Sequence, residues 1–211
     1  MIGIYGGTFD PIHYGHLRTA LEVKEAVSLD ELRFIPSQIP PHRDTPGATP
    51  EQRLAMLQAA LQDGEPGFRI DTRELERPGP SYMADTLASI RAEIRAEPLG
   101  LIVGLDAFMG LARWHRWREL FELAHVLVMQ RPGPAPEFPA ELQAQFDTRA
   151  TEDTAALREC SAGRIHFVAV TQLDISATGV RSAIASGRSA RYLTPDPVLA
   201  LITRLNLYRA D

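Results

Sequence analysis

The sequence has little of what several common classes of protein require. A single cysteine, Cys160, cannot form an internal disulfide and cannot by itself supply a thiolate zinc site. The formal charge of -5 gives no basic excess, which argues against broad binding of nucleic acid. No apolar run approaches membrane-spanning length, and the first residues lack a basic segment followed by an apolar run and a cleavage site. We therefore expect a cytoplasmic protein that binds neither membranes nor nucleic acid.

Internal repeats and long low-complexity linkers are also absent. A length of 211 residues with 45% hydrophobic content then fits one domain with a good core. Residues 134–163 are rich in Ala, Glu, Gln and Pro and have few apolar anchors. We expect a single domain over residues 1–211, with residues 134–163 as a peripheral insertion and residues 188–211 as a C-terminal helical segment.

Apolar periodicity predicts strands that alternate with helices along the chain. The strands are expected near residues 3–5, 31–35, 68–72, 99–103, 126–129 and 165–170. The helices are expected near residues 15–27, from 49 to before 64, 81–94, 175–187 and 197–205, with a short helical stretch around residues 114–117. Such alternation predicts an α/β fold, a Rossmann-like doubly wound parallel sheet with helices on both faces in a single domain.

The loop at residues 6–16 reads GGTFDPIHYGH and joins the first strand to the first helix. Gly6 and Gly7 let the backbone approach a ligand closely, and a helix N-terminus favours an anion such as phosphate. His13 and His16, three positions apart, share one face of the first helical turn. No lysine follows to make a P-loop, and the pattern is not G-x-G-x-x-G. A structural turn or a metal site are alternative interpretations, but Asp10 lies in the proline turn and no other ligand completes a metal set.

Polar side chains follow several of the predicted strands. His13 and His16 follow the first, His42 and Arg43 the second, Asp106 a central one and Ser176 the last. In parallel sheets ligands bind beyond the carboxyl ends of the strands. We therefore expect these residues to form one polar pocket.

Two motifs carry a family resemblance. The first loop contains H-x-G-H, and residues 175–181 read ISATGVR. Together they resemble the nucleotidyltransferase superfamily of adenylyl- and cytidylyltransferases, which shares H-x-G-H and an I-S-[ST]-T-x-x-R-like motif. Further stretches are similar to the bacterial nicotinate-nucleotide adenylyltransferases, and the resemblance covers nearly the whole chain except residues 134–163. These stretches are Pro40–Arg43, Ser81–Tyr82 with Thr86–Leu87, Gly104–Asp106, Trp114 and Arg131–Gly133.

The resemblance implies adenylyl transfer from ATP to nicotinate mononucleotide, giving nicotinate adenine dinucleotide (deamido-NAD) and pyrophosphate in NAD biosynthesis. The attack is in line and has no covalent intermediate, so catalysis rests on positioning and electrostatic stabilisation. His16, His13 and Arg181 are the implied catalytic residues. The implied ATP and phosphate ligands are Gly6, Gly7, Thr8, Phe9, His13, His16, Gly104, Asp106, Ile175, Ser176, Thr178 and Arg181. Magnesium is expected on the ATP phosphates, where it keeps several waters because no all-protein carboxylate cage is visible.

The resemblance also implies a set of residues for nicotinate mononucleotide. They are His42, Arg43, Met83, Thr86, Asp106, Trp114, His115 and Arg131. Trp114 would stack on the pyridine ring, and backbone N–H groups near Met83 and His115 would receive the carboxylate. Met83 departs from the threonine common in the family, and Ala177 replaces the commoner serine. Simpler interpretations remain for Trp114 as packing, Asp106 as a helix cap, and His42 and Arg43 as a solvated turn.

Other interpretations stay open at this point. The acceptor could be nicotinamide mononucleotide or phosphopantetheine, or the chain could be a non-catalytic nucleotide-binding regulatory module. The sequence leaves a monomer and a small homo-oligomer equally open. His125 and His166 lie beside apolar strand residues and are interpreted as structural.

Overall fold

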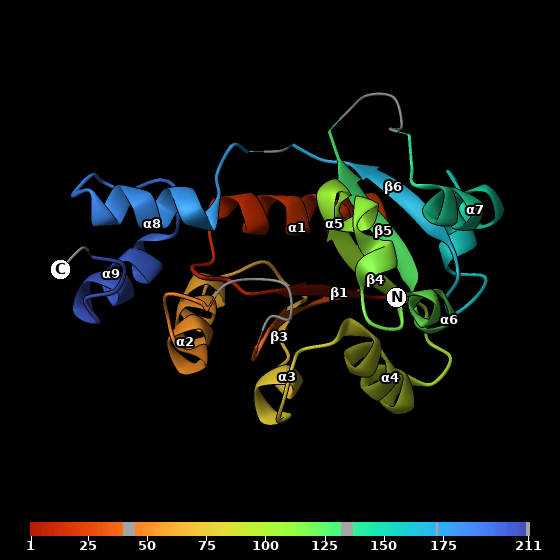
Figure 1. Cartoon of the computed structure of the whole chain (residues 1–211), viewed down its shortest axis with the longest axis horizontal. Helices are drawn as coiled ribbons and strands as arrows, with labels where there is room; N and C mark the ends of the chain where they lie inside the picture. The colour runs from red at the N-terminus through yellow and green to blue at the C-terminus, as the bar shows by residue number, and fades with distance from the viewer. Residues whose placement is uncertain (40–44, 132–136, 172, 210–211) are drawn as a thin grey trace. The chain divides into compact units, whose positions relative to one another are not determined.

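The computed structural model describes residues 1–39, 45–131, 137–171 and 173–209. Six strands form one sheet in the order β3-β2-β1-β4-β5-β6 (Figure 1). The strands are β1 (Ile2–Gly7), β2 (Glu31–Pro36), β3 (Phe68–Ile70), β4 (Leu99–Gly104), β5 (His125–Gln130) and β6 (Ile165–Ala169). This is the strand order of a doubly wound nucleotide-binding sheet, in which the chain winds outward from β1 to β3, returns to β4 beside β1 and then winds outward in the opposite direction. The predicted Rossmann-like α/β fold is confirmed.

The chain divides into two compact units. Unit 1 comprises Met1–Tyr5, Glu22–Arg33 and Tyr82–Thr171, and unit 2 comprises Gly6–Leu21, Phe34–Ser81 and Gln172–Asp211. Strands β1 and β2 and helix α1 (Tyr14–Ala26) each run from one unit into the other. Among the described residues, no helix combines the length and the apolar character that crossing a bilayer requires.

Unit 1 is built on the pairing of β1 with β4, β4 with β5 and β5 with β6, all parallel. Residues 99–103 of β4 are all buried, as expected for a strand covered on both faces. Its helices are α4 (Met83–Ile94), α5 (Leu105–Met109), α6 (Leu120–Leu123) and α7 (Ala140–Arg149), with short 3₁₀ turns η1 (Leu111–Arg113), η2 (Trp117–Glu119) and η3 (Ala155–Leu157). Helix α4 packs on α6, and α5 packs on β4 and β5.

The segment expected as a peripheral insertion contributes to the core of unit 1. Leu142 of α7 and Leu157 are fully buried. The ring of Phe146 meets that of Phe167 on β6, with centroids 5.7 Å apart. Ala150 forms a parallel bridge with Ile165. A small number of large side chains is therefore enough to pack this segment against unit 1.

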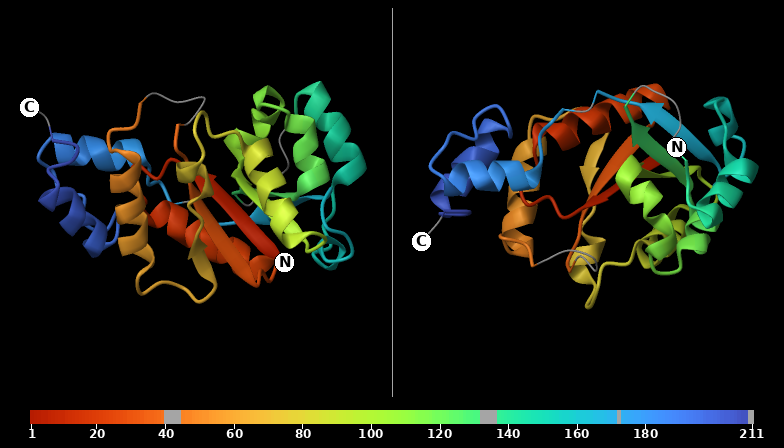
Figure 2. Two further views of the ribbon diagram at one scale, coloured as in Figure 1. Left: turned by 90° about the horizontal axis from the view of Figure 1, so that it is seen from below. Right: turned by 45° about the horizontal axis from the view of Figure 1, so that its top comes forward.

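Unit 2 contains α2 (Pro50–Leu61), α8 (Ala177–Ala185) and α9 (Asp196–Arg204). The predicted capping box of α2 is confirmed, because Gln52 N donates 3.3 Å to Thr49 Oγ1 and Thr49 N donates 2.9 Å to Gln52 Oε1. Helix α2 packs on α9. In both views of Figure 2, α8 and α9 (blue) lie together, with Val180 buried in their shared cluster.

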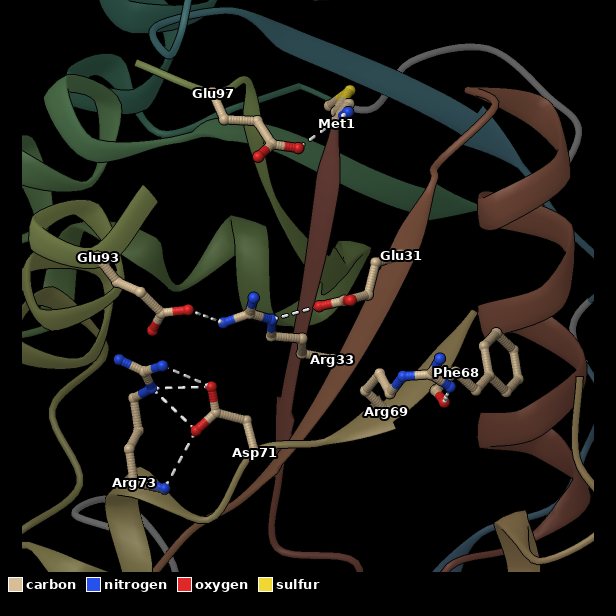
Figure 3. A network of polar contacts seen from close by, with 9 residues as sticks. All are labelled: Met1, Glu31, Arg33, Phe68, Arg69, Asp71, Arg73, Glu93 and Glu97. Atoms are coloured by element: carbon tan, nitrogen blue, oxygen red, sulfur yellow. Dashed lines mark hydrogen bonds and ion pairs between the residues drawn. The ribbon is translucent and has the colours of Figure 1, made fainter. Parts of the chain in front are cut away.

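Ion pairs fix the ends of several elements, as Figure 3 shows. In unit 1, the Arg33 guanidinium on β2 donates to Glu31, and at 3.1 Å to Glu93 of α4. In unit 2, Arg73 pairs with Asp71, with Nη2 and Oδ2 2.7 Å apart. This pair opens the short helix α3 (Arg73–Glu76), which the sequence did not predict, and the strand expected over residues 68–72 ends at residue 70.

Candidate functional site

The loop after β1 places two histidines at the start of α1. His13 immediately precedes the helix and His16 lies in its first turn, so the predicted helix start is confirmed. The two imidazole rings are stacked, with centroids 3.7 Å apart and an interplanar angle of 27°. A Cβ at Gly15 would lie 2.9 Å from His13 Nδ1 and 3.0 Å from the carbonyl oxygen of Ile175. Glycine is therefore required for this close approach.

His13 is buried, with 5% of its surface exposed. Burial lowers the pKa of His13 to about 4, so its imidazole is neutral at physiological pH. Within the described part of the chain, its Nδ1 is buried without a hydrogen-bond partner. The His16 ring is partly exposed and meets the edge of the Phe9 ring, with centroids 5.3 Å apart. The loop thus offers a buried polar nitrogen and a more accessible imidazole beside a helix N-terminus.

The second motif lies in the same unit, against the first loop. Ser176 caps α8, because its Oγ accepts a hydrogen bond of 3.0 Å from Gly179 N, as predicted. Arg181, one turn into the helix, donates from Nη1 to the carbonyl oxygen of Asp10 at 2.8 Å, across 171 positions of sequence. Its Nη2 lies 3.4 Å from Thr178 Oγ1. The structure therefore brings the two motifs together within unit 2, at the starts of α1 and α8 (Figure 1).

Arg53 was missed in the sequence, although it is a central residue of this region. It is fully buried on α2, and it donates from Nη1 to the carbonyl oxygen of Thr8 at 2.8 Å and from Nη2 to that of Ser37 at 2.7 Å. Burial lowers the pKa of Arg53, and the nearby Asp10 charge opposes this shift. A guanidinium still remains charged at neutral pH. The available signal was its position four residues before Leu57, on the apolar face of α2.

Asp10 is the second residue that sequence reasoning missed. Its Oδ2 accepts a hydrogen bond of 2.8 Å from Gly47 N, and its Oδ1 accepts one of 3.1 Å from Ala48 N. Oδ1 also accepts a hydrogen bond of 2.7 Å from the Tyr208 hydroxyl, and Oδ2 lies 3.7 Å from Arg181 Nη1. The aspartate therefore organises the loop from within. In the sequence, neither the proline turn at Asp10 nor the distant Tyr208 indicates that Asp10 has this role.

Those of the residues expected to bind the mononucleotide that the structure describes lie in unit 1. Gly104 ends β4 and caps α5, and Asp106 is exposed in the first turn of that helix. Trp114 is partly exposed directly after η1, while the neighbouring Trp117 is buried against Phe121. Of the two tryptophans, only Trp114 therefore has surface for a ligand.

The first turn of α4 and the segment after Trp114 are joined. Met83 is the first residue of α4, so its N–H belongs to the group that a helix leaves without an internal partner. The Tyr82 ring lies 4.4 Å from the exposed His115 ring, measured between centroids. Arg116 Nη1 donates to Asp85 Oδ1 at 2.8 Å. The start of α4 is thus in contact with the segment that follows Trp114, and a carboxylate site at Met83 and His115 stays a prediction.

The remaining predicted residues have different fates. Thr86 is fully buried, and its hydroxyl donates to the carbonyl oxygen of Tyr82 at 3.3 Å. Arg131 is exposed after β5, while His42 and Arg43 lie outside the described residues. The predicted structural role of the two strand histidines is supported by their contacts. His125 Nδ1 accepts from Arg164 N at 3.1 Å, and His166 Nδ1 lies 2.8 Å from the carbonyl oxygen of Thr151.

The chain is similar to known proteins over nearly its whole length. A sequence model described as cytidylyltransferase-like matches residues 4–183. A probable nicotinate-nucleotide adenylyltransferase from Methylococcus capsulatus is 57% identical over 208 residues, covering 99% of each chain. Another from Halorhodospira halophila is 52% identical, covering 98% of this chain and 94% of that protein.

A solved structure shares the fold. It is the Plasmodium falciparum nicotinic acid mononucleotide adenylyltransferase complexed with NaAD, which has a TM-score of 0.74 at 14% identity and covers 98% of this chain and 96% of that one. The alignments with the curated relatives extend over both motifs and both units. The chain belongs to the cytidylyltransferase-like family and, within it, to the nicotinate-nucleotide adenylyltransferases.

Proposed function

We propose that this protein transfers the adenylyl group of ATP to nicotinate mononucleotide, forming nicotinate adenine dinucleotide and pyrophosphate in NAD biosynthesis. The observation that carries the proposal is the joining of the two motifs in unit 2 through the 2.8 Å hydrogen bond from Arg181 to the Asp10 carbonyl oxygen. The names of relatives at 57% and 52% identity support the choice of acceptor. A cytoplasmic location, where ATP is available, is part of the proposal.

The chemistry is a direct displacement at phosphorus. A phosphate oxygen of the mononucleotide attacks the α-phosphorus of ATP, and the bond from that phosphorus to the bridging oxygen breaks as pyrophosphate leaves with the electron pair. In this type of reaction the protein supplies positioning and charge stabilisation. His16 contacts the α-phosphate, His13 supports it, and the first turn of α8 with Thr178 and Arg181 receives the β- and γ-phosphates.

The stacked histidines suit this task. His13 is neutral before ATP binds, because burial lowers its pKa to about 4. An arriving phosphate favours the protonated form of a nearby imidazole. Two stacked imidazoles would repel each other if both were charged, so we expect at most one proton to be added to the pair. Gly6, Gly7, Thr8, Phe9 and Ile175 complete the phosphate loop in this proposal.

Magnesium belongs to the ATP side of the proposal. Within the ranges that the structure describes, no group of three or more His, Cys, Asp or Glu side chains is placed to hold a metal ion. Magnesium is commonly held by substrate phosphates and water with few protein ligands, so it can arrive with ATP. We propose that magnesium would screen the negative charge of the triphosphate while His16 and Arg181 hold the triphosphate in place.

Unit 1 supplies acceptor selection in this proposal. Trp114 stacks on the pyridine ring, and the N–H groups of Met83 and His115 receive the nicotinate carboxylate. Asp106 binds a ribose hydroxyl, and Gly104 lets the ligand pass close to the backbone. Thr86 supports the start of α4 through its hydrogen bond to Tyr82. His42, Arg43 and Arg131 are proposed to approach the acceptor phosphate.

Pyrophosphate release with ATP and magnesium tests the proposal. The acceptors compared are nicotinate mononucleotide, nicotinamide mononucleotide and phosphopantetheine, at equal concentrations. We expect the highest kcat/KM with the nicotinate form. A higher kcat/KM with one of the other two acceptors would identify that compound as the substrate in place of nicotinate mononucleotide. ATP binding without turnover of any of the three acceptors would indicate a regulatory module instead.

A further inference from the structure

Tyr208 lies in the segment after α9, yet its hydroxyl contacts the loop before α1. The hydroxyl donates 2.7 Å to Asp10 Oδ1, across 198 positions of sequence. The φ of Tyr208 is 61°, in the left-handed region that non-glycine residues seldom adopt. Such a conformation persists only where the surroundings determine it. The contact with Asp10 is therefore a specific feature of unit 2.

The backbone at Gly47 is shaped to accept this contact. A Cβ at Gly47 would lie 3.2 Å from two ring carbons of Tyr208, closer than ordinary packing. The N–H groups of Gly47 and Ala48 donate to the same Asp10 carboxylate at 2.8 and 3.1 Å. Ring, backbone and carboxylate thus form one packed cluster. Burial and the neighbouring carboxylate raise the pKa of the Tyr208 phenol, so the hydroxyl remains a donor.

The orientation of the carboxylate matters for Arg181. Asp10 Oδ1 is turned toward Tyr208 and Ala48, which leaves Oδ2 toward Gly47 and 3.7 Å from Arg181 Nη1. The same guanidinium nitrogen donates to the Asp10 carbonyl oxygen at 2.8 Å. Asp10 is 5% exposed, so water cannot easily replace a lost donor. Removing the Tyr208 hydroxyl therefore takes away one of the donors that orient the Asp10 carboxylate, which loosens its ion pair with Arg181.

We propose that Tyr208 is a positioning residue for adenylyl transfer: its hydroxyl fixes the Asp10 carboxylate, and Asp10 holds the Arg181 guanidinium where it meets the ATP phosphates. This inference rests on the phosphate-binding role proposed for Arg181. Tyr208 itself touches no reacting atom.

The test compares Tyr208→Phe with Tyr192→Phe, which makes the same change at a tyrosine of unit 2 that is 79% exposed. We expect Tyr208→Phe to lower kcat by about tenfold, because a hydrogen bond to a charged group is lost. The KM for nicotinate mononucleotide should stay within about twofold, because no acceptor contact changes. Tyr192→Phe should match the wild type. A Tyr208→Phe enzyme with wild-type kcat, measured well below its melting temperature, would reduce the residue to a structural role and overturn the proposal.

The Arg181→Ala background supplies a second readout. If Tyr208 acts through Arg181, adding Tyr208→Phe to Arg181→Ala should not lower kcat further. Independent, multiplying effects of the two changes would overturn the proposal. Should Tyr208→Phe fail to fold by circular dichroism, Asp10→Asn replaces it, and full kcat in that variant would have the same meaning.

ATP affinity, measured by calorimetry, separates this inference from the proposed function. A wild-type protein that binds ATP but releases no pyrophosphate with any acceptor would refute adenylyl transfer. The positioning inference would then be judged on ATP affinity alone. Weaker ATP binding by Tyr208→Phe than by the wild type supports it, and equal binding overturns it.

Discussion

The residues of unit 2 that we propose to hold the ATP phosphates and the residues of unit 1 that we propose to select the acceptor are held by different kinds of interaction. In unit 2, Asp10, His13 and Arg53 are all buried, and Arg53 is fully so. The hydrogen bonds of Asp10 and Arg53 join segments far apart in the chain. In unit 1, the segment after Trp114 is tied to α4 by Arg116, whose side chain is 41% exposed, and by the Tyr82–His115 ring contact.

This difference has a physical consequence for function. A buried polar group is expensive to leave without a partner, so each contact in unit 2 constrains several others. An exposed ion pair is screened by water and is typically worth ~0–1 kcal/mol. The residues proposed to hold the transferring phosphate are therefore rigidly determined, whereas the turn proposed to select the acceptor can be altered at little cost. We expect changes in unit 2 to affect kcat or folding, and changes in unit 1 to affect the choice of acceptor.

The largest effect is expected at the first loop. His16→Ala removes the proposed donor to the α-phosphate and should lower kcat on the order of 10²–10³-fold, since losing one such donor costs ~2.7–4 kcal/mol. Because His16 is partly exposed, the fold should lose little stability. Steady-state pyrophosphate release and thermal unfolding measure the two quantities. His166→Asn is the matched control at a histidine outside the site, and unchanged turnover in His16→Ala would contradict the assignment.

The second prediction concerns the pH dependence of stability. The pKa of His13 is about 4 in the folded chain and 6.5 in the reference state, so the unfolded chain binds more protons between these values. Stability is therefore fully present above pH 6.5 and declines as the pH falls toward 4, by ~3 kcal/mol. Below pH 4 both states are protonated and the contribution of His13 becomes constant. Burial also lowers the pKa of His125, which adds a loss of the same sign.

Urea unfolding at a series of pH values checks this prediction. His13→Asn should remove most of the slope that His13 contributes, because asparagine does not titrate. His125 stays in place in this variant and accounts for a smaller remaining slope. An identical slope in wild type and variant would show that His13 titrates normally in the folded chain.

The same contrast explains what the sequence could predict. The alternation of strands with helices was sufficient to predict the α/β fold class, and β4 and β5 could be recognised as strands because their residues form continuous apolar runs. His13 and Ser176 could be singled out from the sequence because they follow predicted strands, and Arg181 because it completes the motif that carries the family resemblance. Asp10, Arg53 and Tyr208 were not found, because their roles depend on contacts across 16 to 198 positions of sequence. From the sequence alone an arginine is expected at the surface, and only the structure shows the carbonyl oxygens that let Arg53 be buried.

The smaller errors of the sequence-based prediction concern short elements and helix ends. Helix α3 exists because Asp71 pairs with Arg73, and four residues are too few for a periodic signal. The position of Met83 at the first turn of α4 was predicted within two residues, which is the usual precision of a helix boundary. The contact of Tyr82 with His115 joins segments whose separation in sequence gave no indication of it.

A smaller effect is expected from the acceptor side of the comparison. Trp114→Ala should raise the KM for nicotinate mononucleotide by about tenfold, since stacking of a base on an aromatic ring is worth ~1–3 kcal/mol. The KM for ATP should not change. Trp114→Phe is the control, because phenylalanine keeps a stacking face. An equal rise in the KM for ATP would indicate a general structural defect rather than the loss of a pyridine contact.

The smallest effect is expected at Arg116, whose exposed ion pair contrasts most with the buried hydrogen bonds of unit 2. Its ion pair with Asp85 joins exposed side chains, so Arg116→Ala should cost ~0.2–1 kcal/mol of stability. The KM for the mononucleotide should rise by no more than about threefold, and more at low salt than at high salt, because ions screen the pair. Arg116→Ala, Asp85→Ala and the double variant form a cycle that isolates the coupling energy from other effects. A coupling energy of several kcal/mol, or a large loss of kcat, would show that unit 1 is determined as tightly as unit 2. The proposed difference between a rigid phosphate site and an adjustable acceptor site would then be wrong, because even the exposed Arg116–Asp85 pair would be strongly coupled.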